Sequence, residues 1–247
     1  MTEEQLTTPQ VGSKLRHQIL RMPAAVKEAT GISIYGRVIR SLIFSTDLAI
    51  IKNCDADAVF AVYPFTPQQA ISRAIIEAAD VPVFCGCGGG TTKGVRTVSL
   101  AKDVESQGAL AVVLNAPITN LNLRTVTQNI DIPTVITVVS PDTDIDARIR
   151  NGAAMINVAG GKNTAAIVAK IRQNHPNLPI IASGGKTEES IQETIKAGAN
   201  AITYTPPTSA ELFSSMMDTY RDPAVKQKLG ISIPRRIQNN LKKHLHK

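Results

Sequence analysis

The chain has 247 residues, of which 43% are hydrophobic and 4% aromatic, so Val, Ile, Leu and Ala must fill its core. No window approaches the roughly 18 consecutive apolar residues of a membrane span, and the polar N-terminus differs from a secretory signal, so we expect a cytoplasmic protein without a membrane partner. The net charge of +7 comes from the last 25 residues, which contain seven Lys or Arg and no acidic residue. Because the rest of the chain is neutral, nucleic acid is not an expected partner.

Eight runs rich in β-branched residues and bounded by turn signals predict eight strands. Most runs are continuously apolar, which is typical of strands buried on both faces of a parallel sheet. In chain order they are RVIRSLIFS (37–45), DAVFAVYPF (57–65), VPVFCGCGGG (81–90), ALAVVLNAP (109–117), IPTVITVVS (132–140), AAMINVAGG (153–161), LPIIASGGK (178–186) and NAITYTPP (200–207).

Segments with helical spacing follow the strands, and the first of them, at 47–56, is the shortest. The others lie at 66–80, 95–108, 121–130, 143–152, 163–174, 187–198 and 209–221. Eight alternating β–α units predict an α/β fold, the (β/α)8 TIM barrel, because right-handed crossovers put every helix outside and closure removes both edge strands. An open doubly wound sheet is the alternative.

One domain is therefore expected, with the barrel over residues 37–222. Residues 8–30 precede the first strand and predict a helical extension, with Pro9 at its first position. Residues 223–247 form the basic tail, where Ile237, Leu241 and Leu245 recur every four residues and predict an amphipathic helix.

The segment LPIIASGGKTEESIQETIKAGANAITYTP resembles the last two β–α units of the aldolase-type, phosphate-binding TIM barrels. The resemblance implies that loops after strands seven and eight hold a phosphate, with Ser183, Gly184 and Gly185 at the matching positions. The chain departs from this pattern at the end of the eighth strand, which has Pro206 and Pro207 where glycine is usual.

Three loops at the expected C-terminal face are rich in glycine, and each carries a lysine. Glycine lets backbone amides approach an anion and lysine adds a point charge, so these loops predict a phosphate site. The alternative is that the glycines only make tight turns. The expected phosphate-binding residues are Gly88, Gly89, Gly90, Gly160, Gly161, Ser183, Gly184 and Gly185.

Catalytic candidates also lie where strands end. We expect Lys162 and Lys186 to hold the anion or polarise a carbonyl, Asp47 or Asp142 to move a proton, and Asn115 to orient the substrate. Both aspartates are alternatively helix caps, or could share Mg²⁺ through a substrate phosphate. The four histidines lie away from this face, and no cluster has the spacing of metal ligands, so no metal site is expected.

The cysteines, Cys54, Cys85 and Cys87, are an odd number in a long chain, which predicts free thiols. Cys85 and Cys87 are too close in sequence for an easy disulfide or, by themselves, a four-ligand zinc site. The two hypotheses for them are a reactive thiol and buried packing.

These features together favour an enzyme that acts on a small phosphorylated metabolite, as an aldolase-like carbon–carbon lyase or a sugar-phosphate isomerase. We expect a homo-oligomer that requires no cofactor. An FMN-dependent oxidoreductase is an alternative, because FMN-binding barrels share the IIASGG ending and some resemble NVAGGK. The third reading is a non-catalytic barrel that senses a phosphorylated ligand.

Overall fold

The computed structural model describes residue 11 and residues 19–221. The chain divides into two compact units, residues 1–206 and 207–247, and the second unit contains helix α8 (Ser209–Arg221). No described helix combines the length and the apolar character that crossing a membrane requires. The amphipathic helix expected within 223–247 lies outside the described residues.

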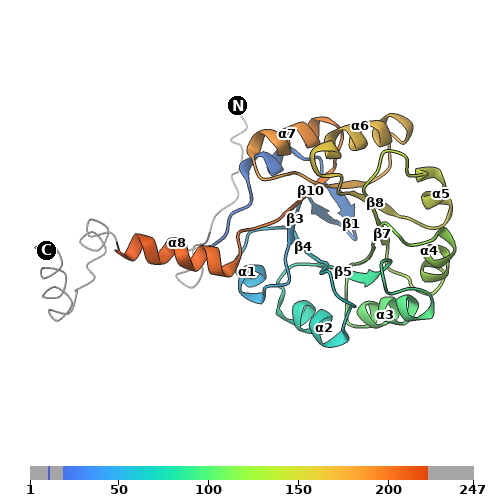
Figure 1. The fold of residues 1–247 in the computed structure, drawn as a ribbon, viewed down its shortest axis with the longest axis horizontal. Coiled ribbons are helices and arrows are strands. Elements are labelled where there is room, and N and C mark those ends of the chain that lie inside the picture. Colours follow the sequence, from blue (N-terminus) through green and yellow to red (C-terminus); the bar gives the residue numbers. More distant parts are fainter. Residues whose placement is uncertain (1–10, 12–18, 222–247) are drawn as a thin grey trace, which may run out of the picture. The chain divides into compact units, whose positions relative to one another are not determined.

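Eight parallel strands of the first unit close into a barrel in the order β10-β3-β4-β5-β6-β7-β8-β9 (Figure 1). The (β/α)8 prediction is confirmed. The barrel strands are β3 (Ser41–Phe44), β4 (Ala58–Ala61), β5 (Val83–Gly88), β6 (Ala111–Leu114), β7 (Thr134–Val138), β8 (Met155–Val158), β9 (Ile180–Ser183) and β10 (Ala201–Tyr204). The helices that follow them are α1 (Leu48–Lys52), α2 (Gln69–Ala78), α3 (Val95–Ser106), α4 (Asn120–Thr127), α5 (Ile145–Arg150), α6 (Thr164–Asn174) and α7 (Glu188–Lys196).

The strands are buried on both faces, as their continuous apolar runs predict. The larger hydrophobic cluster packs the outer face of the strands against the helices. A second cluster fills the barrel interior, where Phe60 and Phe84 stack with ring centroids 6.4 Å apart. Successive side chains alternate between the two clusters, which is the period of two that a strand imposes.

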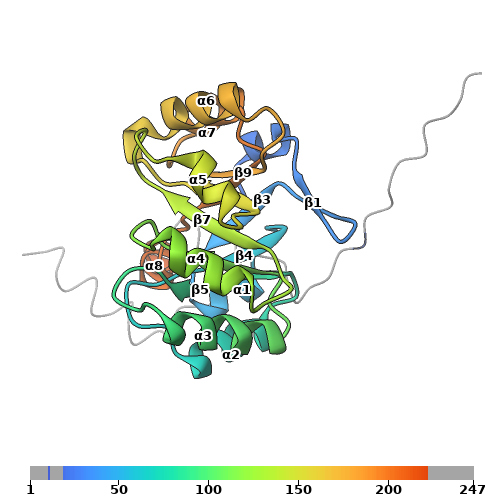
Figure 2. The ribbon, with the colours of Figure 1, turned by 90° about the vertical axis from the view of Figure 1, so that its right-hand side faces the viewer.

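A β-hairpin closes the end of the barrel at which the strands begin. Its strands, β1 (Ile32–Ile34) and β2 (Arg37–Ile39), pair antiparallel around Tyr35 and Gly36, which have φ of 48° and 76°. Ile32, Ile34 and Ile39 belong to the interior cluster. Figure 2 shows the hairpin at the end of the barrel opposite the arrowhead of β7.

The prediction of one strand over residues 37–45 is wrong in its first half. Residues 37–39 belong to the hairpin, and the barrel strand begins only at Ser41. The break is at Arg40, whose N–H and that of Ser41 both donate to the Asp57 carboxylate, at 2.8 and 3.0 Å. Two positive φ values in a two-residue turn are typical of the hairpin, and a tyrosine–glycine pair between short apolar runs was the available signal.

From residue 19 onward, the leading segment is not the helix that was predicted over 8–30. Leu20 pairs with Cys54 as an isolated parallel bridge, and only Ala24–Glu28 (η2) is helical, as a 3-10 helix. The Glu188 carboxylate accepts hydrogen bonds from the first amides of η2, at 2.9 and 2.7 Å. Proline at position 23 disfavours helical backbone in the residue before it, which explains the break.

Candidate functional site

A pocket opens at the C-terminal end of the barrel because β5 lacks side chains there. Positions 84 and 86 of β5 point into the barrel, and position 86 is glycine. The register shifts between Gly86 and Gly88, and a Cβ on Gly88 would face Thr92 and Thr97. A Cβ on Gly86 would lie 3.2 Å from Val62, so the backbone itself forms the wall. The pocket has a volume of about 220 Å³.

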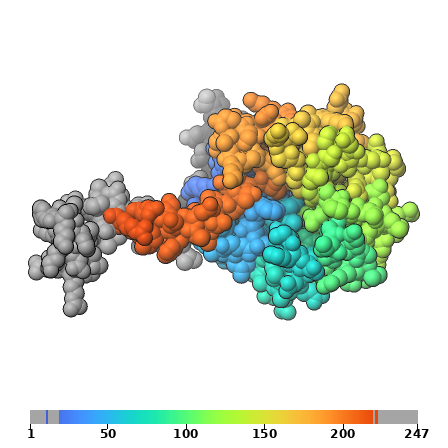
Figure 3. All heavy atoms as spheres, viewed as in Figure 1, coloured from blue at the N-terminus to red at the C-terminus, as the bar shows by residue number. Residues whose placement is uncertain are grey.

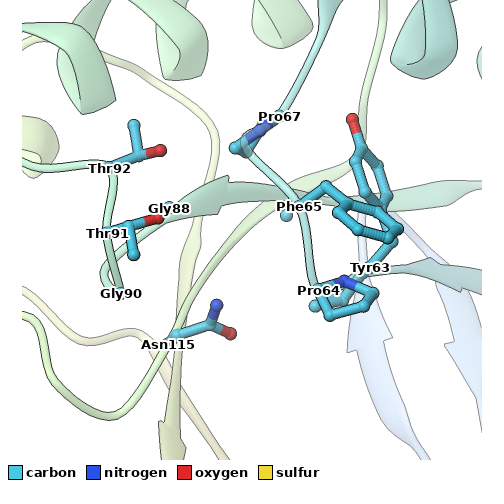
Figure 4. A pocket seen from close by; sticks show the side chains of 11 residues that line it. Tyr63, Pro64, Phe65, Pro67, Gly88, Gly90, Thr91, Thr92 and Asn115 are labelled. Carbon is cyan, nitrogen blue, oxygen red and sulfur yellow. The ribbon is translucent and has the colours of Figure 1, made fainter.

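The walls of this pocket differ in chemistry (Figure 4). The loop after β4 contributes Tyr63 and Phe65 on one side, and the loop after β5 contributes Thr91 and Thr92 on the other, with the Asn115 amide turned towards the space between them. The Tyr63 hydroxyl accepts a hydrogen bond of 2.8 Å from the backbone of the same loop, which holds the ring in place. The remaining lining residues are Val62, Pro64, Pro67, Gly86, Gly88 and Gly90.

Two glycines in this loop fit the chain closely around Asn115. Gly89 has φ of 101°, and a Cβ there would lie 2.7 Å from the Asn115 nitrogen. Gly88 accepts a hydrogen bond of 2.8 Å from the same nitrogen. A side chain at position 89 would therefore displace Asn115 from the pocket.

Arg148 of α5 fixes the loop that follows Asn115. Its guanidinium donates to the carbonyls of Ile118 and Ala116, at 2.7 and 3.1 Å, and to the Asn120 side chain at 2.8 Å. Burial lowers the pKa of Arg148 from its ordinary value. The carbonyls of this loop are thus satisfied by a cation that no sequence motif connects with Asn115.

A second feature of this end is a layer of polar side chains inside β7–β10. Thr137 pairs in register with Asn157, and Ser183 with Thr203. Asn157 donates through Nδ2 to Thr137 Oγ1 at 3.3 Å, and the hydroxyls of Ser183 and Thr203 lie 3.3 Å apart. Asn157 is 4% exposed, and its Oδ1 is buried without a hydrogen-bond partner.

The sequence-based list contained Ser183 but missed Thr137, Asn157 and Thr203. Each lies inside an apolar run, so it did not stand out as a strand end. A usable signal existed, since each of these strands places an apolar residue inward and a polar one two positions later, as in Met155 and Asn157.

Two turns have the sequence Gly-Gly-Lys, at residues 160–162 and 184–186. In each turn, packing requires the first glycine and the backbone conformation favours the second. A Cβ on Gly160 would lie 2.5 Å from Ile167, and one on Gly184 would lie 2.8 Å from Ile191. Both of these glycines donate their N–H within the chain, to Thr164 Oγ1 at 3.1 Å and to Thr203 O at 3.4 Å. The second glycines, at 161 and 185, have φ of 59° and 80°.

Both turns keep open amides. Among the described residues, the N–H groups of Gly161, Lys162, Gly185 and Lys186 have no hydrogen-bond partner. Lys162 and Lys186 are both exposed. Anion binding at these turns therefore stays a prediction, with these four amides and the ammonium groups of the two lysines as the available donors.

The two aspartates named from sequence lie in different surroundings. Asp47 is the N-cap of α1, and its carboxylate accepts from the N–H of Ala49 at 2.8 Å and of Ile50 at 3.3 Å. Asp142 lines a separate pocket between α5 and α6, with Lys170. Asp142 thus does not share the pocket of Asn115, and the cap of α5 is Asp144.

Asp47→Asn should leave the free energy of unfolding within about 0.5 kcal/mol of the wild type, whereas Asp47→Ala should lower it by about 1 kcal/mol, because asparagine caps a helix nearly as well as aspartate. Urea unfolding measures both. If Asp47→Asn still folds but loses as much free energy of unfolding as Asp47→Ala does, the carboxylate charge does more than cap α1.

The cysteines are free thiols, as predicted. Cys85 and Cys87 point away from the pocket into the core between β5 and the helices, at 1% and 0% exposed. Burial raises the pKa of Cys85 to about 12 and that of Cys87 well above its ordinary value. This favours packing over reactivity. No cluster of three or more His, Cys, Asp or Glu in the described part of the chain could hold a metal ion.

A thiol reagent should label only Cys54 in the native protein and all three cysteines in urea, since the reactive species is the thiolate.

The free energy of unfolding should fall at high pH because of the two buried thiols. The folded state keeps protons that the unfolded state loses above about pH 9, so this contribution is full below pH 9 and is lost as the pH rises towards 12. Above pH 9, the melting temperature should therefore fall more steeply with pH in the wild type than in the double variant Cys85→Ala/Cys87→Ala. Equal slopes would contradict the raised pKa of the buried thiols.

No protein-family model matches the chain, and no curated protein matches its sequence. Solved structures match its fold. A phosphonopyruvate hydrolase with oxalate and Mg²⁺ has a TM-score of 0.58 and 11% identity, over 83% of this chain and 92% of that one. A dihydrodipicolinate synthase from Bacillus anthracis has a TM-score of 0.52 and 16% identity, over 76% and 78%.

A phosphoribosyl anthranilate isomerase from Thermococcus kodakaraensis has a TM-score of 0.52 and 16% identity, over 74% of this chain and 98% of that one. At these identities the similarity is one of fold. Together with the closed eight-stranded barrel, it shows that this chain has the (β/α)8 TIM-barrel fold.

Proposed function

We propose that this protein is an enzyme that binds a small phosphorylated metabolite at the C-terminal end of its barrel. The observation that carries the proposal is Asn157, whose Oδ1 is buried without a partner. Such an acceptor costs roughly 1–3 kcal/mol. A ligand hydroxyl or N–H that donates to Oδ1 would remove this cost, which supports a polar ligand inside the barrel mouth.

The turns after β8 and β9 support a phosphate as the ligand's anionic part. The open N–H groups of Gly185 and Lys186 could donate to it, and Lys162 or Lys186 could add a charge contact. Each charge-assisted bond would contribute roughly 1.5–3 kcal/mol. In this arrangement the remaining hydroxyls of the polar layer, on Ser183 and Thr203, would orient the ligand beside Asn157.

For the reaction we propose carbon–carbon cleavage of the aldolase type or sugar-phosphate isomerisation. The barrels compared above include a hydrolase, a synthase and an isomerase, so this fold hosts several reaction classes. Lys162 or Lys186 would polarise the carbonyl or move the proton once ligand binding removes water from its ammonium group. The Asn115 amide would hold the substrate against β5.

The proposal is tested by thermal shift with phosphorylated sugars and their unphosphorylated counterparts as matched controls. A ligand at 100 times its dissociation constant stabilises by about 2.7 kcal/mol, so only the phosphorylated member of a pair should shift the midpoint. Turnover of that ligand, followed by NMR, should fall in Lys162→Met or Lys186→Met. Equal shifts within every pair would contradict the proposal, and a yellow protein with flavin absorption would favour an FMN-dependent oxidoreductase instead.

A further inference from the structure

We infer that the pocket between the loops after β4 and β5 receives an uncharged ring of the substrate, one with an apolar face and a hydrogen-bonding edge. The inference rests on the proposed function for the position of the phosphate. In the strand order of the barrel, β4 and β5 lie opposite β8 and β9, whose turns would hold that phosphate. The ligand would therefore span the mouth, with its anionic end on one side and its ring on the other.

The lining of this pocket is uncharged. None of the eleven residues that line this pocket has a side chain that is charged at neutral pH. Buried or partly buried charges are costly without a partner, so a phosphate or carboxylate is a poor occupant here. An uncharged group fits better. Gly88 and Gly90 are thus assigned to the wall of a ring pocket in place of the phosphate site expected from their sequence.

One wall of the pocket is apolar and rigid. The Phe65 side chain is exposed, at 75% of the residue's surface, and among the described residues its ring has no aromatic partner. Pro64 and Pro67 fix the backbone on either side of it, and the Tyr63 hydroxyl is tied to the same loop. An exposed aromatic ring on a rigid loop offers a face against which a ligand ring can stack.

The side of the pocket opposite Phe65 is polar. Among the described residues, the Asn115 amide and the Thr91 hydroxyl have no hydrogen-bond partner. An amide both donates and accepts, so it recognises a ring edge that carries an acceptor beside a donor. Figure 4 shows this amide between the aromatic and the threonine walls.

The volume limits the occupant to a single ring or one fused pair of rings. The pocket measures about 220 Å³. It holds about seven water molecules at the liquid volume of roughly 30 Å³ each. A nucleobase and a pyranose ring both have this size, an apolar face and a polar edge, and the experiment separates them.

Calorimetric titration with four phosphorylated probes, and with adenosine as a further control, tests the inference. Adenosine 5′-monophosphate is compared with ribose 5-phosphate, which lacks the base, and glucose 6-phosphate with glycerol 3-phosphate, which lacks the ring. We expect at least a tenfold gain in affinity from the ring in one of the two pairs. The pair that shows the gain identifies the base or the sugar as the occupant.

The gain should disappear in Phe65→Ala and persist in the control Leu121→Ala, which removes an apolar side chain of similar exposure, 77%, outside the pocket. Lys186→Met should weaken both members of a pair equally. Phosphate-dependent binding without a gain in either pair would overturn the ring pocket and leave the proposed function intact. Adenosine that binds as tightly as its monophosphate would support the ring pocket and contradict the phosphate site.

Discussion

Asn157→Leu is expected to weaken ligand binding at least tenfold while the free energy of unfolding stays unchanged or rises. Leucine has nearly the shape of asparagine, and it removes a buried acceptor that has no partner in the free protein. Such a replacement is neutral or stabilising, whereas removing a partner from a satisfied hydrogen bond costs roughly 1–3 kcal/mol. Thr137 is only half-buried, so water can replace the bond that it loses.

The matched control is Asn200→Leu. The Asn200 side chain is satisfied, since Oδ1 accepts from Arg172 at 2.6 Å and from the Ile180 N–H at 3.0 Å, and Nδ2 donates to Thr30. This variant should lose stability and keep its ligand affinity. Urea unfolding and calorimetry on both variants decide the matter. A destabilised Asn157→Leu that binds like the wild type would mean that the amide serves the fold.

Gly89→Ala should lower the free energy of unfolding by about 3 kcal/mol, from backbone strain and overpacking combined. Its φ of 101° disfavours any side chain, and the new Cβ would lie 2.7 and 2.8 Å from Asn115 backbone atoms, which cannot move aside as a flexible side chain would. The surviving folded protein should also bind ligand more weakly, because Asn115 would be displaced.

Gly90→Ala, one residue further, is the control for this prediction. A Cβ at Gly90 meets nothing within 4 Å. The change should stay within about 0.5 kcal/mol of the wild type. Urea unfolding of both variants measures the difference, and similar stabilities would show that the loop relaxes around the added methyl group.

Sequence alone predicts the barrel because its signal is local and repeated. Each barrel strand is a short apolar run, and a helix follows it along the chain. The hairpin was missed because apolar residues continue across Arg40, so that the strands on either side of it read as one run. From residue 19 onward the predicted leading helix was wrong for a tertiary reason, since Leu20 pairs with Cys54 and Glu188 caps η2.

The site divides in the same way. Asn115 was predicted because it directly follows a strand, and the structure places it in the pocket. Asp142 follows a strand too, yet its loop turns outwards to the α5–α6 groove, where Lys170 donates to the Pro141 carbonyl at 2.6 Å. Whether Asn157 Oδ1 finds a partner depends on the side chains that the neighbouring strands place beside it, and no local sequence pattern indicates that it has none.

Figure 3 shows the C-terminal end of the barrel as a surface on which segments far apart in sequence meet, and we propose that a phosphorylated ligand binds there. Nitrogen–proton correlation NMR tests it most directly, with the phosphorylated sugar that gives the largest thermal shift. We expect the amide signals of Gly161, Gly185 and Lys186 and the side-chain signal of Asn157 to move with ligand concentration, while those of Tyr35 and Gly36 at the opposite end stay fixed. Saturable binding that leaves the first four signals in place would contradict it.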